Sequence, residues 1–147
     1  GHTERLINKL GLSKRINFKT NLTKEEIALA YAESSVAIVS SLYEGFGYPV
    51  AEAMACSVPL IATNIASIPE ITDDYAELIP IKDAQAIASS IRKIFSESDM
   101  YNKRAEKGRD HIKNKFNRHR IAKQYEKLMI DVINNHRSVI KGNNANL

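Results

Sequence analysis

Two carboxylates on either side of a glycine-containing turn are the part of the sequence best suited to bind a ligand. Residues 44–52 read Glu-Gly-Phe-Gly-Tyr-Pro-Val-Ala-Glu, so seven residues separate Glu44 from Glu52. Carboxylates accept hydrogen bonds from hydroxyls, and backbone that contains glycine can turn several N–H groups towards one point. Such a motif suits a ligand that carries both hydroxyls and phosphate.

The runs on either side of the motif predict a loop between a strand and a helix. Residues 36–41 are β-branched and apolar enough for a buried parallel strand, whereas residues 49–56 have a helix-forming composition with proline first. Residues 44–48 are then the loop at the carboxyl end of a strand, where N–H groups and a helix N-terminus converge. We expect Glu44 to lie over that point, and Glu52, one helical turn further on, to accept two hydroxyls of a ribose.

The remaining sequence alternates strands with helices. The expected strands are residues 15–19, 36–41, 58–63 and 77–81, and the expected helices are 3–10, 23–35, 49–56, 67–72, one from Asp83, one from Asp99 and a last one after it. The sequence Thr23 to Glu26 has the form of a capping box, which starts the second helix. The alternation predicts one α/β domain, a parallel sheet covered by helices on both faces.

The last helix carries an apolar stripe. We interpret it as a side that faces the core. Its members are Ile121, Tyr125, Leu128, Met129 and Val132. The tail 141–147 has too few apolar residues to pack, and we expect it to be frayed.

Charge is unevenly distributed along the 147 residues. Residues 1–80 have a net charge of −4 and residues 81–147 a net charge of +8, which together give the formal +4. The basic residues either decorate solvent-facing helices or meet an anionic membrane surface or a partner domain. Nucleic acid is not expected, because no aromatic-interleaved basic motif accompanies the charge. No run of about 18 apolar residues and no secretory signal is present, so the expected location is the cytoplasm, with peripheral membrane contact as one use of the basic helices.

Cysteine and histidine give no sign of a metal site or a catalytic thiol. Cys56 is the single cysteine, and its Ala-rich surroundings predict a buried, inert thiol in a reducing compartment. The four histidines, His2, His111, His119 and His136, show no metal-binding spacing and are expected on helices or at the surface.

The carboxylate motif continues into a longer pattern. Ala53-Met54-Ala55-Cys56 follows Glu52, and then come Val-Pro-Leu-Ile-Ala-Thr at 58–63 and Pro69-Glu70-Ile71. In this combination the chain resembles the retaining GT-B glycosyltransferases of group 1, also called family 4, from the 15–19 strand to the last helix. The resemblance implies a Rossmann-like C-terminal half of a GT-B fold, which ends in long basic helices and binds a nucleotide-sugar donor.

The resemblance also implies roles for single residues. Glu44 is expected to contact hydroxyls of the donor sugar as the catalytic carboxylate, Glu52 to hold the ribose, and Asn21 and Leu22 to lie near the base. The donor sugar and diphosphate are expected to contact Gly45, Phe46, Gly47, Tyr48, Pro49 and Val50. Members of the family transfer sugar with retention to a saccharide or lipid-linked acceptor, and without an essential metal or cofactor.

The chain departs from the family pattern in two ways. Residues 1–140 resemble a partial donor-binding domain, because a first strand bearing an Arg and a Lys, and the acceptor-binding domain, are missing. We therefore expect a fragment that is inactive alone and that self-associates through an exposed sheet edge. Four glycines of the pattern are also replaced, by Thr20, Ser57, Ala66 and Ser67, where loss of glycine restricts positive φ angles.

Two alternatives to a transferase domain stay open from the sequence. One is a sugar-nucleotide epimerase or phosphorylase of the same fold. The other is a non-catalytic module that uses its basic helices for protein or membrane contacts and need not retain Glu44 and Glu52.

Overall fold

Three short parallel strands form the centre of the fold. In the computed structural model, which describes the backbone of residues 1–144 and the side-chain environment of residues 1–134, strands β1 (Ala37–Val39), β2 (Leu60–Thr63) and β3 (Glu77–Ile79) lie in the order β1-β2-β3. All four residues of β2 are buried. The predicted α/β class with a parallel sheet is therefore confirmed, with strands shorter than the sequence predicted.

Helices cover both faces of this sheet. Helices α2 (Lys24–Ala32), α3 (Tyr48–Ala55), α4 (Ile68–Thr72), α5 (Ala84–Ser96) and α6 (Ser98–Lys115) form these layers, with a 3₁₀ turn at Asp73–Tyr75. Helices α1 (His2–Lys9) and α7 (Arg118–Asn144) do not cover the sheet. The capping box of α2 forms as predicted, because Thr23 N donates to Glu26 and Glu26 N donates to Thr23 Oγ1, at 2.8 and 3.2 Å.

The core has two parts, one on each face of β2. Leu60 and Ala62 point to the face covered by α3 and α4, where Met54 and Ile68 are fully or almost fully buried. Ile61 points to the opposite face, where it packs with residues of α5 and α6. This alternation is the two-residue period of a strand buried on both sides.

The segment 15–19 does not form the predicted strand. Residues 16–20 have no regular secondary structure, and Phe18 is 62 % exposed. A strand needs a neighbour for its N–H and C=O groups, and this segment pairs with none of the three strands in the described part of the chain. Alternation in sequence therefore predicted an extended backbone but not its pairing.

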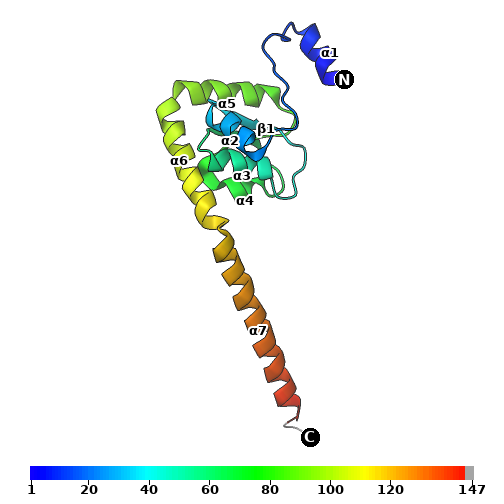
Figure 1. Cartoon of the computed structure of the whole chain (residues 1–147), viewed down its shortest axis with the longest axis vertical. Coiled ribbons are helices and arrows are strands. Elements are labelled where there is room, and N and C mark those ends of the chain that lie inside the picture. The colour runs from blue at the N-terminus through cyan, green and yellow to red at the C-terminus, as the bar shows by residue number, and fades with distance from the viewer. Residues whose placement is uncertain (145–147) are drawn as a thin grey trace.

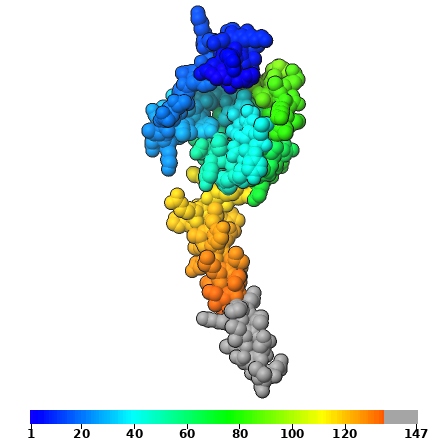
Figure 2. All heavy atoms as spheres, turned by 90° about the vertical axis from the view of Figure 1, so that its right-hand side faces the viewer, coloured from blue at the N-terminus to red at the C-terminus, as the bar shows by residue number. Residues whose placement is uncertain are grey.

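The prediction that the stripe on the last helix is core is also wrong for most of its members. Figure 1 shows α7 leading away from the body, and Figure 2 shows the same from the side. The exposed fractions are 61 % for Tyr125, 58 % for Leu128, 62 % for Met129 and 59 % for Val132. The stripe is uncovered because α7 leaves the body just after it begins. None of the described helices is long and apolar enough to cross a membrane.

The C-terminal tail is only partly described. Helix α7 continues to Asn144, and residues 145–147 of the expected frayed tail lie outside the described residues.

Two of the residues that replace family glycines adopt left-handed backbone angles. Ser57 has φ 57° and Ala66 has φ 45°, whereas Thr20 is not among the positive-φ residues and its neighbour Asn21 has φ 56°. Ser57 follows the last turn of α3, and its N–H donates to Met54 O at 3.0 Å. Left-handed angles are unfavourable for residues with a side chain, so Ser57 and Ala66 carry backbone strain at positions where the sequence pattern led us to expect glycine.

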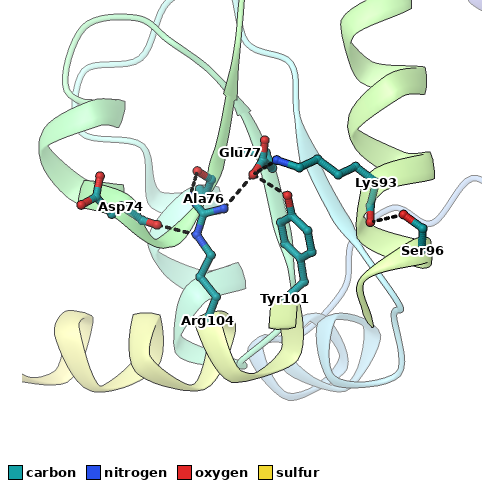
Figure 3. A network of polar contacts seen from close by, with 7 residues as sticks. All are labelled: Asp74, Ala76, Glu77, Lys93, Ser96, Tyr101 and Arg104. Carbon is teal, nitrogen blue, oxygen red and sulfur yellow. Dashed lines mark hydrogen bonds and ion pairs between the residues drawn. The ribbon is translucent and has the colours of Figure 1, made fainter. Parts of the chain in front are cut away.

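A cluster of polar contacts joins β3 to α5 and α6 (Figure 3). Arg104 and the Tyr101 hydroxyl both donate to Glu77 Oε1, at 2.7 and 2.6 Å, and Lys93 Nζ lies 3.7 Å from the same oxygen. Arg104 also donates to the carbonyls of Asp74 and Ala76. Burial alone would raise the pKa of Glu77, but the hydrogen bonds from Tyr101 and Arg104 and the charges of Lys93 and Arg104 outweigh it and lower this pKa.

Replacing Ser57 by glycine is expected to stabilise the protein. Ser57→Gly removes the left-handed strain and a buried hydroxyl that has no hydrogen-bond partner among the described residues. We expect a gain of about 1 kcal/mol, which raises Tm by roughly 3–5 °C in thermal unfolding followed by circular dichroism. Ser35→Gly is the matched control, because Ser35 is exposed and is not among the residues with positive φ, so it has no such strain to lose. An equal or lower Tm for Ser57→Gly would contradict the strain.

The Glu77 cluster is expected to make stability depend on pH. Because the folded-state pKa is lowered, its contribution is present above the unfolded pKa of about 4.3 and is lost as pH falls through the folded value. At neutral pH, Glu77→Gln should cost about 1–2 kcal/mol, and the difference from wild type should shrink below about pH 4. Urea unfolding of both proteins, from neutral pH to below about pH 4, measures this difference in the free energy of unfolding. The exposed Glu106→Gln on α6 is the control, for which a similar loss would refute a specific role of Glu77.

Candidate functional site

The carboxylate motif forms a loop between β1 and α3, as the sequence predicted. Gly47 caps α3 in the left-handed conformation with φ 92°, and Pro49 lies in the first turn. A β-carbon on Gly47 would also come within 3.4 Å of Ile71 Cδ1. That distance is an ordinary van der Waals contact, so it is the left-handed backbone angle that favours glycine here.

Three consecutive N–H groups of this loop are free. Those of Gly45, Phe46 and Gly47 donate to no acceptor among the described residues. By contrast, the Val50 N–H donates to Gly47 O at 3.0 Å, and its side chain is fully buried. Of the residues expected to bind the donor sugar and diphosphate, Gly45 to Gly47 therefore offer donors, whereas Val50 offers neither a free N–H nor side-chain surface. Tyr48 is 70 % exposed, and Pro49 has no N–H.

Glu44 is half-buried at the carboxyl ends of the strands. Ser41 Oγ donates to Glu44 Oε1 at 2.7 Å, and Thr63 Oγ1, at the end of β2, donates to Ser41 O at 2.7 Å. The other carboxylate oxygen of Glu44 accepts no hydrogen bond from the described residues. One oxygen is therefore held and the other is available.

Glu52 is exposed on the side of α3 that faces α2. It lines a cavity of about 270 Å³ together with Ile27, Tyr31 and Cys56. Burial and the nearby Glu52 carboxylate raise the pKa of Tyr31, and the same two causes raise the pKa of Cys56. Both groups stay protonated at neutral pH, so Cys56, which is only half-buried, is not an activated nucleophile.

Glu44 in the loop and Glu52 in the helix that follows it therefore have different neighbours. The cavity that Glu52 lines does not include Glu44, which lies over the strand ends.

Leu22 lies nearer to Glu52 than the sequence distance suggests. Leu22 lines a cavity of about 280 Å³ that includes Ile27 and Tyr31, the two residues that also line the Glu52 cavity. A further cavity of about 530 Å³ lies between Leu22, its preceding residues and α2. Asn21 is exposed beside them. Leu22 and Glu52 thus border adjoining cavities along α2, whereas Asn21 lines none of the three.

Side-chain hydroxyls from three elements hold the backbone of the loop. Thr63 donates to Ser41 O and Ser67 to Phe46 O in the loop, at 2.7 and 2.8 Å, and Tyr31 donates to Pro49 O in the first turn of α3, at 3.3 Å. The Phe46 ring adds an edge-on contact to Phe116 at 5.3 Å. Sequence analysis missed these hydroxyl contacts. The available signal was that Ser41 and Thr63 end two predicted parallel strands, whose carboxyl ends meet at one sheet edge.

No metal centre is evident in the described part of the chain, where no three His, Cys, Asp or Glu side chains are grouped to hold an ion. His111 packs against the Tyr75 ring at 5.1 Å, and His2 and His119 are exposed helix residues. The side chain of His136 lies outside the described residues.

Comparison with known proteins identifies a family and relatives that match most of this chain. Residues 2–111 match the family model of glycosyl transferases group 1. Among curated relatives, the MMP alpha-(1->4)-mannosyltransferase of Mycolicibacterium hassiacum is 30 % identical over 139 residues, which are 90 % of this chain and 34 % of that protein. The chain thus spans about a third of the length of such relatives.

Solved structures show the same fold. Sucrose-phosphate synthase from Thermosynechococcus elongatus superposes with a TM-score of 0.81 and 29 % identity, over 89 % of this chain and 33 % of that one. The Anabaena protein HepE in complex with UDP-glucose gives a TM-score of 0.80 with 20 % identity, over 88 % of this chain and 36 % of that one. These structures are glycosyltransferases with the GT-B fold.

The family model covers well over half of the sequence and includes the strand-to-helix loop with both glutamates. The chain therefore belongs to the group 1 glycosyltransferases, with the fold of their GT-B enzymes.

Proposed function

We propose that this chain binds the donor of a retaining glycosyltransferase, which transfers a sugar from a nucleoside-diphosphate sugar to a saccharide or lipid-linked acceptor. The observation that carries the proposal is the loop after β1. In the described part of the chain, it combines three N–H groups without an acceptor and a carboxylate with one oxygen that accepts no hydrogen bond. These are complementary to the phosphates and to the hydroxyls of one ligand.

The proposed ligand extends from the loop along α2. The diphosphate would lie against the N–H groups of Gly45 to Gly47, and the sugar would meet Glu44. The ribose would then reach Glu52, and the base would lie towards Leu22, whose cavity adjoins that of Glu52. The structure of HepE holds UDP-glucose, a ligand of this class.

The loop supports transfer that needs no metal ion. Negative charge develops on the diphosphate as the bond to the sugar breaks, and fixed N–H groups beside the N-terminus of α3 stabilise it. In the proposed reaction, the departing phosphate oxygen accepts the proton of the acceptor hydroxyl while that hydroxyl attacks from the same face. The acceptor site would lie in a part of the protein beyond this donor-binding unit, since relatives are about three times as long.

A second candidate function is an interaction module that has kept the fold without catalysis. The exposed apolar residues of α7 favour it, because such a surface suits a partner. It requires no nucleotide binding, so the experiment below distinguishes the two.

Calorimetric titration with UDP, GDP, UDP-glucose and GDP-mannose tests the proposal. We expect either the uridine or the guanosine ligands to bind. Glu52→Gln should lower the affinity for both the diphosphate and the diphosphate sugar of that series by about tenfold or more, because hydrogen bonds to a charged acceptor are lost. Glu25→Gln, an exposed carboxyl on α2 that does not line the cavity, is the matched control and should bind as wild type. Absence of binding by the wild-type chain, or equal affinities of Glu52→Gln and wild type, would reject the assignment.

A further inference from the structure

We infer that Ser41 and Thr63 are positioning residues that orient Glu44 towards the donor sugar, an inference that rests on the proposed function. The evidence is the two-step chain of hydrogen bonds from Thr63 through Ser41 to Glu44 Oε1. Neither hydroxyl belongs to the motif that identified the site.

Thr63 provides a rigid starting point for this chain of bonds. It is the last residue of β2, is 1 % exposed, and pairs in register with Ile79 of β3. A buried hydroxyl must find an acceptor, and Thr63 finds it in the carbonyl of Ser41. This contact fixes the backbone at Ser41, two residues after β1 ends.

Because the backbone of Ser41 is held, its side chain can in turn hold the carboxylate of Glu44. Its hydroxyl holds Glu44 Oε1 at 2.7 Å, so the Glu44 side chain is confined before any ligand arrives. A glutamate side chain otherwise rotates about three bonds and must be immobilised on binding. With one oxygen tied to Ser41, the second oxygen has a defined direction in which to accept a hydroxyl.

Loss of the Ser41 hydroxyl should therefore affect only the binding of the hexose part of the donor. A nucleoside diphosphate without the hexose has no group for Glu44 to contact, so its affinity should not depend on Ser41. A nucleoside-diphosphate hexose should lose its additional affinity when Glu44 is no longer held, because an acceptor that is poorly placed discriminates weakly between hydroxyl positions. A merely structural role of Ser41 would weaken both ligands alike.

The first experiment compares UDP with UDP-glucose, and GDP with GDP-mannose, on the whole chain by calorimetric titration. For Ser41→Ala, we expect the hexose form to bind about tenfold more weakly while the affinity for the diphosphate alone changes less than about twofold. Ser41→Thr, which keeps the hydroxyl, should restore the wild-type difference. Ser40→Ala, the same change at the exposed neighbouring residue, is the matched control and should have no effect.

Thr63 is tested through the same measurement. Thr63→Val keeps the shape of the side chain and removes the donor to Ser41 O. It should therefore weaken binding of the hexose form selectively, whereas Thr63→Ser should not. Thermal unfolding of each variant shows that the fold is intact. Equal weakening of diphosphate and hexose forms, or no weakening of either, would overturn the positioning role.

A second readout requires no ligand and so separates this inference from the proposed function. Scalar couplings of the Glu44 β-protons in solution NMR should report one side-chain rotamer in wild type and Ser41→Thr, and averaged rotamers in Ser41→Ala. Averaged couplings already in wild type would overturn the inference even if nucleotides bind. A single rotamer in a wild type that binds no nucleotide would overturn the proposed function and leave Ser41 as the residue that orients this carboxylate.

Discussion

Strand β2 is buried along its whole length, and this burial determines where ligand-binding groups can lie. Helices α3 and α4 cover one face and α5 covers the other, so no polar group of the strand can serve a ligand from the side. The ends of the strands are left, and at the carboxyl ends the backbone turns into loops whose polar groups need partners. The loop before α3 begins at this edge, and Thr63 at the end of β2 provides its first fixed contact.

The loop is irregular, yet its backbone is well held. Hydroxyls from β2 and the N-cap of α4 donate to loop carbonyls, and one from α2 donates to a carbonyl in the first turn of α3. The N–H groups of Gly45 to Gly47 find no acceptor among the described residues. A planar peptide unit points its C=O and N–H in opposite directions. Holding a carbonyl on the protein side therefore turns the following N–H away from that side. Ser67 does this for the Phe46–Gly47 peptide, although it replaces a glycine of the family pattern.

The sequence allowed prediction of those features that depend on local order. The β1–α3 loop, its glycine turn and the start of α2 at Thr23 follow from residues close together in the chain, and each is present. The parallel sheet followed from the alternation of elements. Pairing and burial were harder to predict, because they depend on which surfaces are opposite one another. The segment 15–19 alternates as a strand but pairs with none of the described strands, and the hydrogen bond from Thr63 to Ser41 joins residues 22 positions apart.

Helix α7 has a consequence for how the protein unfolds. At 27 residues it is about 40 Å long, and its described part has few tertiary contacts, since most of its side chains are exposed. Its helicity therefore relies on intrinsic propensity and neighbouring side-chain pairs more than on packing. Amide exchange in residues 118–134 should accordingly follow a helix–coil equilibrium of its own, decoupled from the cooperative transition of the sheet and its covering helices. Far-ultraviolet dichroism of the whole chain would then combine a broad change from this helix with a sharper one from the body, and a single two-state fit would underestimate the cooperativity of the core.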